Sequence, residues 1–219
     1  MGSGEVIMDA EKEKNVRALV DLTNIVEKCL RCYEEFKDRE PEFRLKFRRW
    51  YNIDPWFFPP NGINKNNLVE GFLGTGDVVF VCMRPSTATF PNPTVKQFYK
   101  LIENYGFQDA HITDLIKCRS KVKIEKGREE KEVENCFGYL LKELEIIYNK
   151  NNKNKKPSLI VAVGNKAYNY LNKKLPQHYK DRLVKITHYS ARGRKEQVFE
   201  KLENDFKRIH QIYHKATTI

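Results

Sequence analysis

Hydrophobic residues in this 219-residue chain gather in four short runs that are separated by amphipathic stretches. Apolar runs of this length, bounded by polar residues and glycine, are typical of buried β-strands. Because helical patterns alternate with them, the sequence predicts βαβ units, a mostly parallel four-stranded sheet and a three-layer α/β/α fold. The predicted strands are DVVFVCM at 77–83, AHITDLI at 110–116, SLIVAVG at 158–164 and RLVKIT at 182–187.

Four stretches carry apolar residues at spacings of three and four, which predicts helices with one buried face. The second stretch begins at Thr94, a residue suited to cap a helix, and stops at Gly106, as helices that end in glycine do. Cys136 lies on the apolar stripe of the third stretch and is expected to face inward. The helices are predicted at about 12–36, 94–105, 129–148 and 195–214.

Composition indicates an ordered chain. It is 40% hydrophobic, which suffices for a core at this length and excludes a disordered protein. No apolar run approaches the roughly 20 residues of a membrane-spanning helix, and the opening MGSG lacks the apolar stretch of a secretion signal. We therefore expect a disordered tail or cloning remnant at 1–10, one domain at 11–219, no membrane partner and a cytoplasmic or nucleoid-associated protein.

The chain is strongly basic, with 40 Lys and Arg against 29 Asp and Glu and a net charge of +11. This excess favours an anionic partner. By itself it fits nucleic acid, a ribosome, an acidic protein or anionic lipid.

Five cysteines, an odd number in a chain without a secretion signal, argue against a disulfide framework and for metal or cluster ligation. Cys29 and Cys32 form a CxxC pair, and Cys118 and Cys136 are flanked by charged residues. A four-thiolate site and a set of unrelated free thiols are both compatible with this spacing. Cys82 lies within the apolar run VVFVCM and is expected to be a buried strand residue.

Ligands of doubly wound sheets bind beyond the carboxyl ends of the strands. The four segments that follow the predicted strands therefore hold the candidate functional residues. They are RPSTATFPNPT, the stretch from Asp114 to Arg119, GNKAY and HYSARGR.

These segments, taken together with the cysteines, resemble the uracil-DNA glycosylase superfamily, and most closely its iron–sulfur branch, family 4. That branch has a CxxC pair, a TNVVKCRPP-like segment, a cysteine opening a helix, an LGxxA turn and an HPS motif. The counterparts here, in the same order, are CLRC, TDLIKCRSK, ENCFGYL, VGNKAY and HYSARGR. The first motif is atypical, because RPSTATFPNPT replaces a Gly-rich segment and is similar to the NPSTA segment of other relatives in the superfamily.

The resemblance implies that Cys29, Cys32, Cys118 and Cys136 bind a 4Fe–4S cluster. Zn²⁺ is the alternative, because four thiolates also suit a tetrahedral zinc ion. Basic neighbours, among them Lys117, would offset the negative charge of the cluster. In either case the site is expected to be structural and to hold the N-terminal helix to the sheet.

The resemblance also implies a monomeric DNA glycosylase of base excision repair. It would extrude a deaminated or otherwise modified base from single- or double-stranded DNA and hydrolyse its N-glycosidic bond. His188 corresponds to the motif histidine that stabilises charge on the departing base, and Asn92 is the candidate for orienting water. The implied base-binding residues are Arg84, Pro85, Ser86, Phe90 and Asp114, and the implied DNA-binding residues are Ser190, Arg192, Arg194 and Lys195.

Asp114 stands where similar relatives have the asparagine that reads the base. An ionised aspartate only accepts hydrogen bonds, so it would oppose the O4 acceptor of uracil, and uracil is expected to be a poor substrate. A carboxyl that keeps its proton, or a base with an amino group, would remove the conflict. Alternatively, Asp114 caps the region of Lys117 or Arg119 and never faces the pocket.

Two other functions stay open at this point. One is a nucleic-acid-binding relative that kept the fold and has lost useful catalysis. The other is a zinc-stabilised nucleotide-binding protein.

Overall fold

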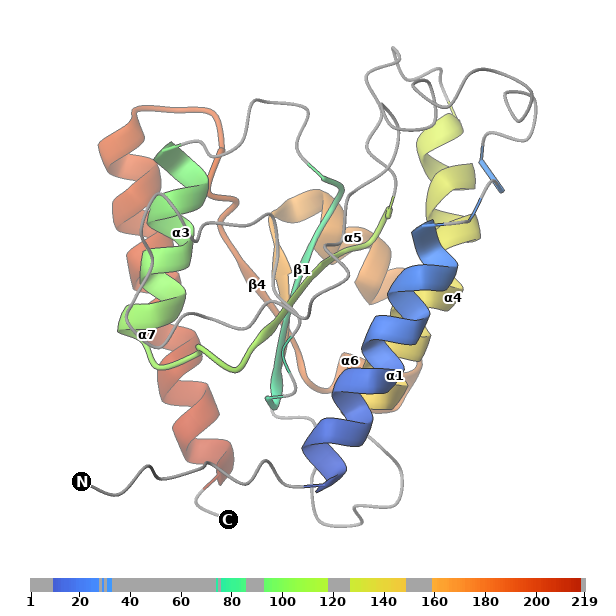
Figure 1. Ribbon diagram of the computed structural model, residues 1–219. Helices are drawn as coiled ribbons and strands as arrows, with labels where there is room; N and C mark the ends of the chain where they lie inside the picture. Colours follow the sequence, from blue (N-terminus) through green and yellow to red (C-terminus); the bar gives the residue numbers. More distant parts are fainter. Residues whose placement is uncertain are drawn as a thin grey trace.

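Four parallel strands form the centre of the fold (Figure 1) and pair in the order β2–β1–β3–β4. The predicted α/β fold with a central four-stranded sheet is confirmed. The strands are β1 (Val78–Cys82), β2 (His111–Asp114), β3 (Leu159–Val163) and β4 (Leu183–Ile186). The structure, a computed structural model, describes residues 10–27, 29, 31–32, 74, 76–85, 93–117, 127–148 and 159–217.

Helices cover both faces of the sheet (Figure 1). Side chains alternate along a strand, so that Phe80 and Cys82 of β1 pack against one helical layer and Val79 and Val81 against the other. The first layer contains α3 (Pro93–Asn104) and α7 (Lys195–Thr217), and the second contains α1 (Ala10–Glu27), α4 (Arg128–Ile147), α5 (Asn165–Lys174) and the short α6 (Gln177–Lys180). No described helix is both long and apolar enough to cross a membrane.

The predicted helix at 12–36 is wrong at its C-terminal end. Helix α1 ends at Glu27, and the chain forms a turn at Arg31 and Cys32. The backbone N–H of Cys29 bonds to the carbonyl of Val26 at 3.1 Å, an i→i+3 contact that tightens and ends the last turn. The first cysteine pair therefore follows the helix.

Helix α5 and the short α6 were not predicted. Ala167, Leu171 and Leu175 are buried at a spacing of four, which was the available signal. Polar and aromatic residues between them obscured this stripe. The other three helices lie within three residues of their predicted bounds.

The sheet has a topological switch point between β1 and β3. From β1 the chain continues through α3 to β2 on one side, whereas β3 is the neighbour of β1 on the other side. In open parallel sheets the crevice at such a point, at the carboxyl ends of the strands, is the usual ligand site.

Candidate active site

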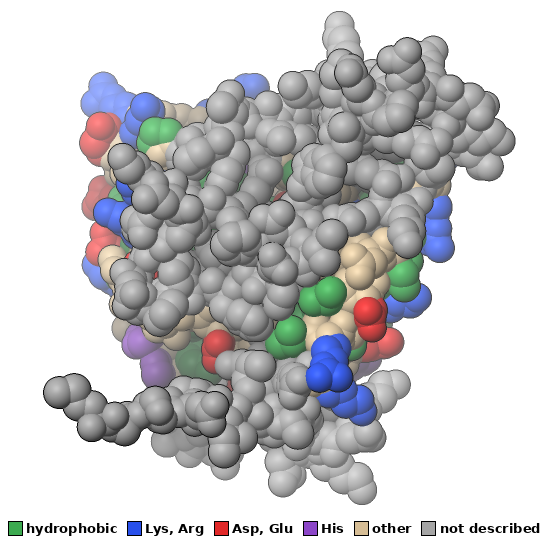
Figure 2. Space-filling model, viewed as in Figure 1, with side chains coloured by type: hydrophobic (Ala, Val, Ile, Leu, Met, Phe, Trp, Pro, Cys, Tyr) green, Lys and Arg blue, Asp and Glu red, His purple; other side chains and the backbone are tan. Residues whose placement is uncertain are grey.

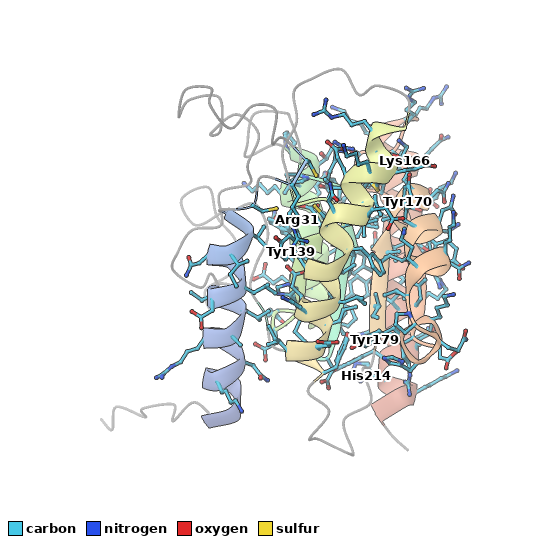
Figure 3. The ribbon with its side chains drawn as sticks, turned by 90° about the vertical axis from the view of Figure 1, so that its right-hand side faces the viewer. Arg31, Tyr139, Lys166, Tyr170, Tyr179 and His214 are labelled. Atoms are coloured by element: carbon cyan, nitrogen blue, oxygen red, sulfur yellow. The ribbon has the colours of Figure 1, made fainter. Side chains whose placement is uncertain are left out.

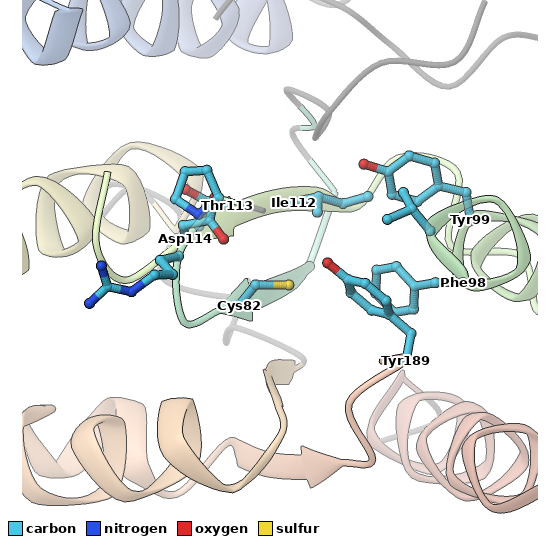
Figure 4. Close-up of a pocket in the computed structure, with 10 residues that line it drawn as sticks. Cys82, Phe98, Tyr99, Ile112, Thr113, Asp114 and Tyr189 are labelled. Atoms are coloured by element: carbon cyan, nitrogen blue, oxygen red, sulfur yellow. The ribbon is translucent and has the colours of Figure 1, made fainter. Parts of the chain in front are cut away.

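A small pocket lies at the carboxyl ends of β1 and β2 beside α3 (Figure 4). Cys82 and Asp114 are register partners in the two strands. The rings of Phe98, Tyr99 and Tyr189 line the side towards α3. Among the described residues the pocket has a volume of about 20 Å³. This volume holds about one water molecule.

Asp114 is 4% exposed and lines this pocket (Figure 4). Alternation along β2 explains its direction: Ile112 packs in the core with α3 and α7, and Asp114, two residues later, points to the same side of the sheet. The structure thus brings Asp114 to the pocket together with two other candidate base-binding residues, Arg84 and Pro85.

His188 follows β4. Its ring stacks on that of Tyr189, a pocket-lining residue, with the centroids 4.5 Å apart, which places His188 beside the pocket. The backbone N–H of Ser190 donates to His188 Nδ1 at 3.1 Å, and Ser190 Oγ is 2.9 Å from the same nitrogen. Since Nδ1 accepts the backbone bond, the ring proton is on Nε2. Burial lowers the pKa of His188, which favours the same neutral form.

Glycine at position 164 makes room for His188. Gly164 lies between β3 and α5, where it is the N-cap residue, and its φ of +91° is a value that residues with side chains rarely adopt. A Cβ at this position would lie 3.0 Å from His188 Cβ and 3.2 Å from His188 Cδ2. The VGNKAY turn therefore serves to seat the histidine.

Arg84 lines the pocket, but its charge is directed to α4. One guanidinium nitrogen, Nη2, lies 2.9 Å from Glu132 and 3.6 Å from Glu129. Lys166 joins the same network through Glu129 at 3.1 Å. The other terminal nitrogen of Arg84 is buried without a hydrogen-bond partner among the described residues. These contacts fix the end of β1 to the start of α4.

Two of the four candidate cysteine ligands, Cys32 and Cys136, come together where α1 ends beside α4. The thiol of Cys32 is within hydrogen-bonding reach of that of Cys136, and the thiol of Cys29 contacts the hydroxyl of Tyr139. Arg31 lies 5.1 Å above the Tyr139 ring (Figure 3). Cys136 is 2% exposed, so the prediction that it faces inward is confirmed, and Cys82 is buried in β1 as expected.

The donors around these sulfurs suit thiolate ligands. The backbone N–H of Lys117 points to Cys136 Sγ at 3.5 Å, and the Asn135 amide to Cys32 Sγ at 3.4 Å. Hydrogen bonds of this kind stabilise metal-bound sulfur. Within the described ranges no three His, Cys, Asp or Glu side chains are already grouped as metal ligands, and Cys118 lies outside those ranges.

A buried polar network occupies the opposite face of β2, and sequence patterns gave no sign of it. Lys117 Nζ lies 2.6 Å from Glu143 Oε2 and 2.7 Å from Thr113 Oγ1. The hydroxyl of Thr113 donates to the same carboxylate at 3.0 Å, and His111 Nε2 is 3.9 Å away from it. Glu143 balances the charge of Lys117 in this network. The role of Lys117 beside a cluster stays a prediction.

The remaining candidates divide into two groups. Ser190, Arg192, Arg194 and Lys195 are exposed on the turn that leads into α7, where Lys and Arg side chains gather at the upper left of Figure 2. Ser86, Phe90 and Asn92 lie outside the described residues. Their predicted roles stay predictions.

The family comparison agrees with this geometry. The family model of the uracil DNA glycosylase superfamily matches residues 75–211, more than half of the chain. The chain therefore belongs to the uracil DNA glycosylase superfamily, whose members generally hydrolyse N-glycosidic bonds. A search among curated proteins found no match.

Proposed function

We propose that this protein is a DNA glycosylase that extrudes a deaminated or modified base and hydrolyses its N-glycosidic bond. The observation that carries the proposal is His188, held as a neutral imidazole by Ser190 beside the pocket that contains Asp114. Both side chains lie at the strand ends where the superfamily fold binds its ligand. Base excision repair is the corresponding cellular process.

In the proposed reaction the bond between C1′ and the base nitrogen breaks, and its electron pair leaves with the base. Negative charge then develops on a carbonyl oxygen of the base. The Nε2–H of His188 donates a hydrogen bond to that oxygen, and a polar group in a dry site stabilises such charge effectively. Water adds to C1′, and the proton that it loses neutralises the departing base anion through solvent. Asn92 is the candidate residue for orienting this water.

The exposed basic residues at the start of α7 support binding of DNA. Arg192, Arg194 and Lys195 lie on the turn that follows His188, so they are placed to contact phosphates on either side of an extruded nucleotide. The net charge of +11 favours the same partner. We propose that the protein acts on DNA as a monomer.

The test is an excision assay on single- and double-stranded oligonucleotides that carry uracil, hypoxanthine, xanthine or oxidised pyrimidines. Cleavage of the resulting abasic site reports each excision. We expect an abasic product from at least one modified base and none from undamaged DNA. DNA binding without any abasic product would instead support a relative that has lost catalysis.

Asp114→Asn is expected to raise uracil excision by roughly ten- to a hundredfold, because an amide donates to O4 where an ionised carboxylate cannot. The measurement is the single-turnover rate on a uracil oligonucleotide, compared with DNA affinity, which should change much less. Asp181→Asn, at an exposed carboxylate before β4, is the matched control. An unchanged or lower rate in a folded Asp114→Asn protein would show that Asp114 does not read the base.

We further propose that the protein belongs to the iron–sulfur, family 4-like branch of the superfamily. Cys29, Cys32, Cys118 and Cys136 would hold a 4Fe–4S cluster that supplies a structural crosslink between the end of α1, the segment after β2, and α4. The support is the cysteine spacing, the contact between the thiols of Cys32 and Cys136, and the N–H donors directed at these two sulfurs. Zn²⁺ bound to the same thiolates is the alternative.

Anaerobically purified protein is expected to be brown, with a broad absorption near about 400 nm and about four iron atoms per chain. Cys136→Ser should lose most of the iron and the colour. Cys82→Ser, which changes a buried cysteine in β1, should retain both. A colourless native protein that contains zinc would contradict the cluster and support the zinc site.

A further inference from the structure

Tyr189 lies inside the candidate base pocket, although it stands where the similar HPS motif has proline. Its ring stacks with two others. The centroid of His188 is 4.5 Å away and that of Phe98 is 4.9 Å away, with interplanar angles of 30° and 28°. In Figure 4 its hydroxyl points towards Cys82. A planar six-membered ring thus already stacks both with His188 and with Phe98 of α3.

Among the described residues, the space that remains in the pocket is too small for a base. The volume of the pocket is about 20 Å³, which holds about one water molecule. A base inserted between Phe98 and Tyr189 would contact one ring on each of its faces. Each carbon–carbon contact takes about 3.5 Å, so the two rings would have to be about 7 Å apart. The observed separation is 4.9 Å. A base that stacks on Phe98 in this pocket must therefore take the place of Tyr189.

Phe98 cannot be the ring that moves. It is 1% exposed and packs against Phe80 and Phe206 at centroid distances of 5.8 and 6.0 Å. Tyr189, in contrast, follows β4 in a tight turn that is closed by a bond from Ala191 N–H to the carbonyl of His188 at 2.9 Å. The residues from Ser190 to Gln197 are exposed, so this turn has solvent to move into.

We propose that Tyr189 is an aromatic plug that occupies the base position against Phe98 and must swing out before an extruded base can bind. This inference rests on the proposed function, because it takes a nucleobase as the ligand. Every base has a stacking face, so the plug competes with all bases and lowers the fraction of molecules that can receive one. The plug thereby weakens the apparent affinity for every base by the same factor.

The turn offers a substitution that removes the ring and keeps the backbone. Tyr189 is the second residue of the His188–Ala191 turn, and no described residue other than glycine has a positive φ. Proline is favoured at this turn position. Tyr189→Pro therefore opens the pocket with the turn intact. Tyr189→Phe retains the ring and is the matched control, and Tyr189→Ala is a second opening variant should the proline variant fail to fold.

The experiment measures the binding of free uracil, cytosine and hypoxanthine by ligand-observed NMR, which requires no excision. At least one base should bind Tyr189→Pro or Tyr189→Ala about tenfold more tightly than native protein, a factor set by the loss of one aromatic stack. Tyr189→Phe should bind like native protein. Equal or weaker binding of all three bases by the folded opening variants would overturn the plug and identify Tyr189 as a wall of the pocket.

Excision assays on the same variants keep the two proposals apart. If an opening variant binds bases more tightly but neither it nor the native protein produces abasic sites, the plug stands and the glycosylase function fails. If the native protein excises bases and the opening variants gain no base affinity, the function stands and the plug fails.

Discussion

Replacing His188 with alanine is expected to slow base excision by about 10²- to 10³-fold, the usual cost of removing one preorganised donor to a developing negative charge. The neutral imidazole, with its proton on Nε2, is the form that Ser190 holds in place. The measurement is the single-turnover rate on the best substrate of the oligonucleotide panel. His178→Ala, which changes an exposed histidine of α6, should leave that rate unchanged.

The supporting contact and the pH profile refine this prediction. Ser190→Ala removes the hydroxyl contact but keeps the backbone N–H bond to Nδ1, so its effect should be less than about tenfold.

Because burial lowers the pKa of His188, the neutral form should persist below pH 6.5, and activity should fall only at more acidic pH. A folded His188→Ala protein that excises at the native rate would refute the assigned role.

Glu143→Gln is expected to destabilise the fold by about 3–5 kcal/mol, because it leaves the buried ammonium of Lys117 without its countercharge. The two groups are 2.6 Å apart and nearly inaccessible to solvent. The measurement is the free energy of unfolding in urea at pH 7. Glu145→Gln, at an exposed carboxylate on the same helix, should change it by less than about 0.5 kcal/mol.

The sign of the pH dependence follows from the pKa of Glu143. Burial acts to raise this pKa, but Lys117 and His111 outweigh burial and lower it to about 2. The pKa of an unfolded glutamate is about 4.3. The stability that the ionised Glu143 contributes is therefore complete above that pH, and it is lost as the pH falls towards 2. Native protein should lose this stability on acidification, whereas Glu143→Gln should not.

A double variant, Lys117→Met with Glu143→Leu, should recover most of the free energy of unfolding that Glu143→Gln loses.

The sheet could be predicted well because each strand is a dense apolar run between polar residues. All residues of β1 and β3 are buried, which is why their hydrophobic pattern is continuous rather than alternating. Helix ends were predictable where glycine marks them, as at Gly106. The end of α1 was not, since the apolar spacing continues past Glu27 into the CxxC segment.

The site could be predicted only where residues lie at strand ends. Asp114 and His188 were assigned to the candidate site in this way, because the fold brings all parallel carboxyl ends to one edge. The pairing of Lys117 with Glu143 joins residues 26 positions apart in sequence and has no local pattern. The proposed role of Tyr189, in the turn after β4, depends on the ring of Phe98 in α3, and such a contact becomes visible only in three dimensions.

The two faces of β2 have a consequence for how the chain finds its native pairing. This strand is at the edge of the sheet and has only four residues, so hydrogen bonds alone specify its alignment with β1 weakly. A slip by one position would turn the carboxylate of Asp114 towards α4 and the hydroxyl of Thr113 away from Glu143. The buried acid on α4 thus acts as a register lock that admits a single alignment.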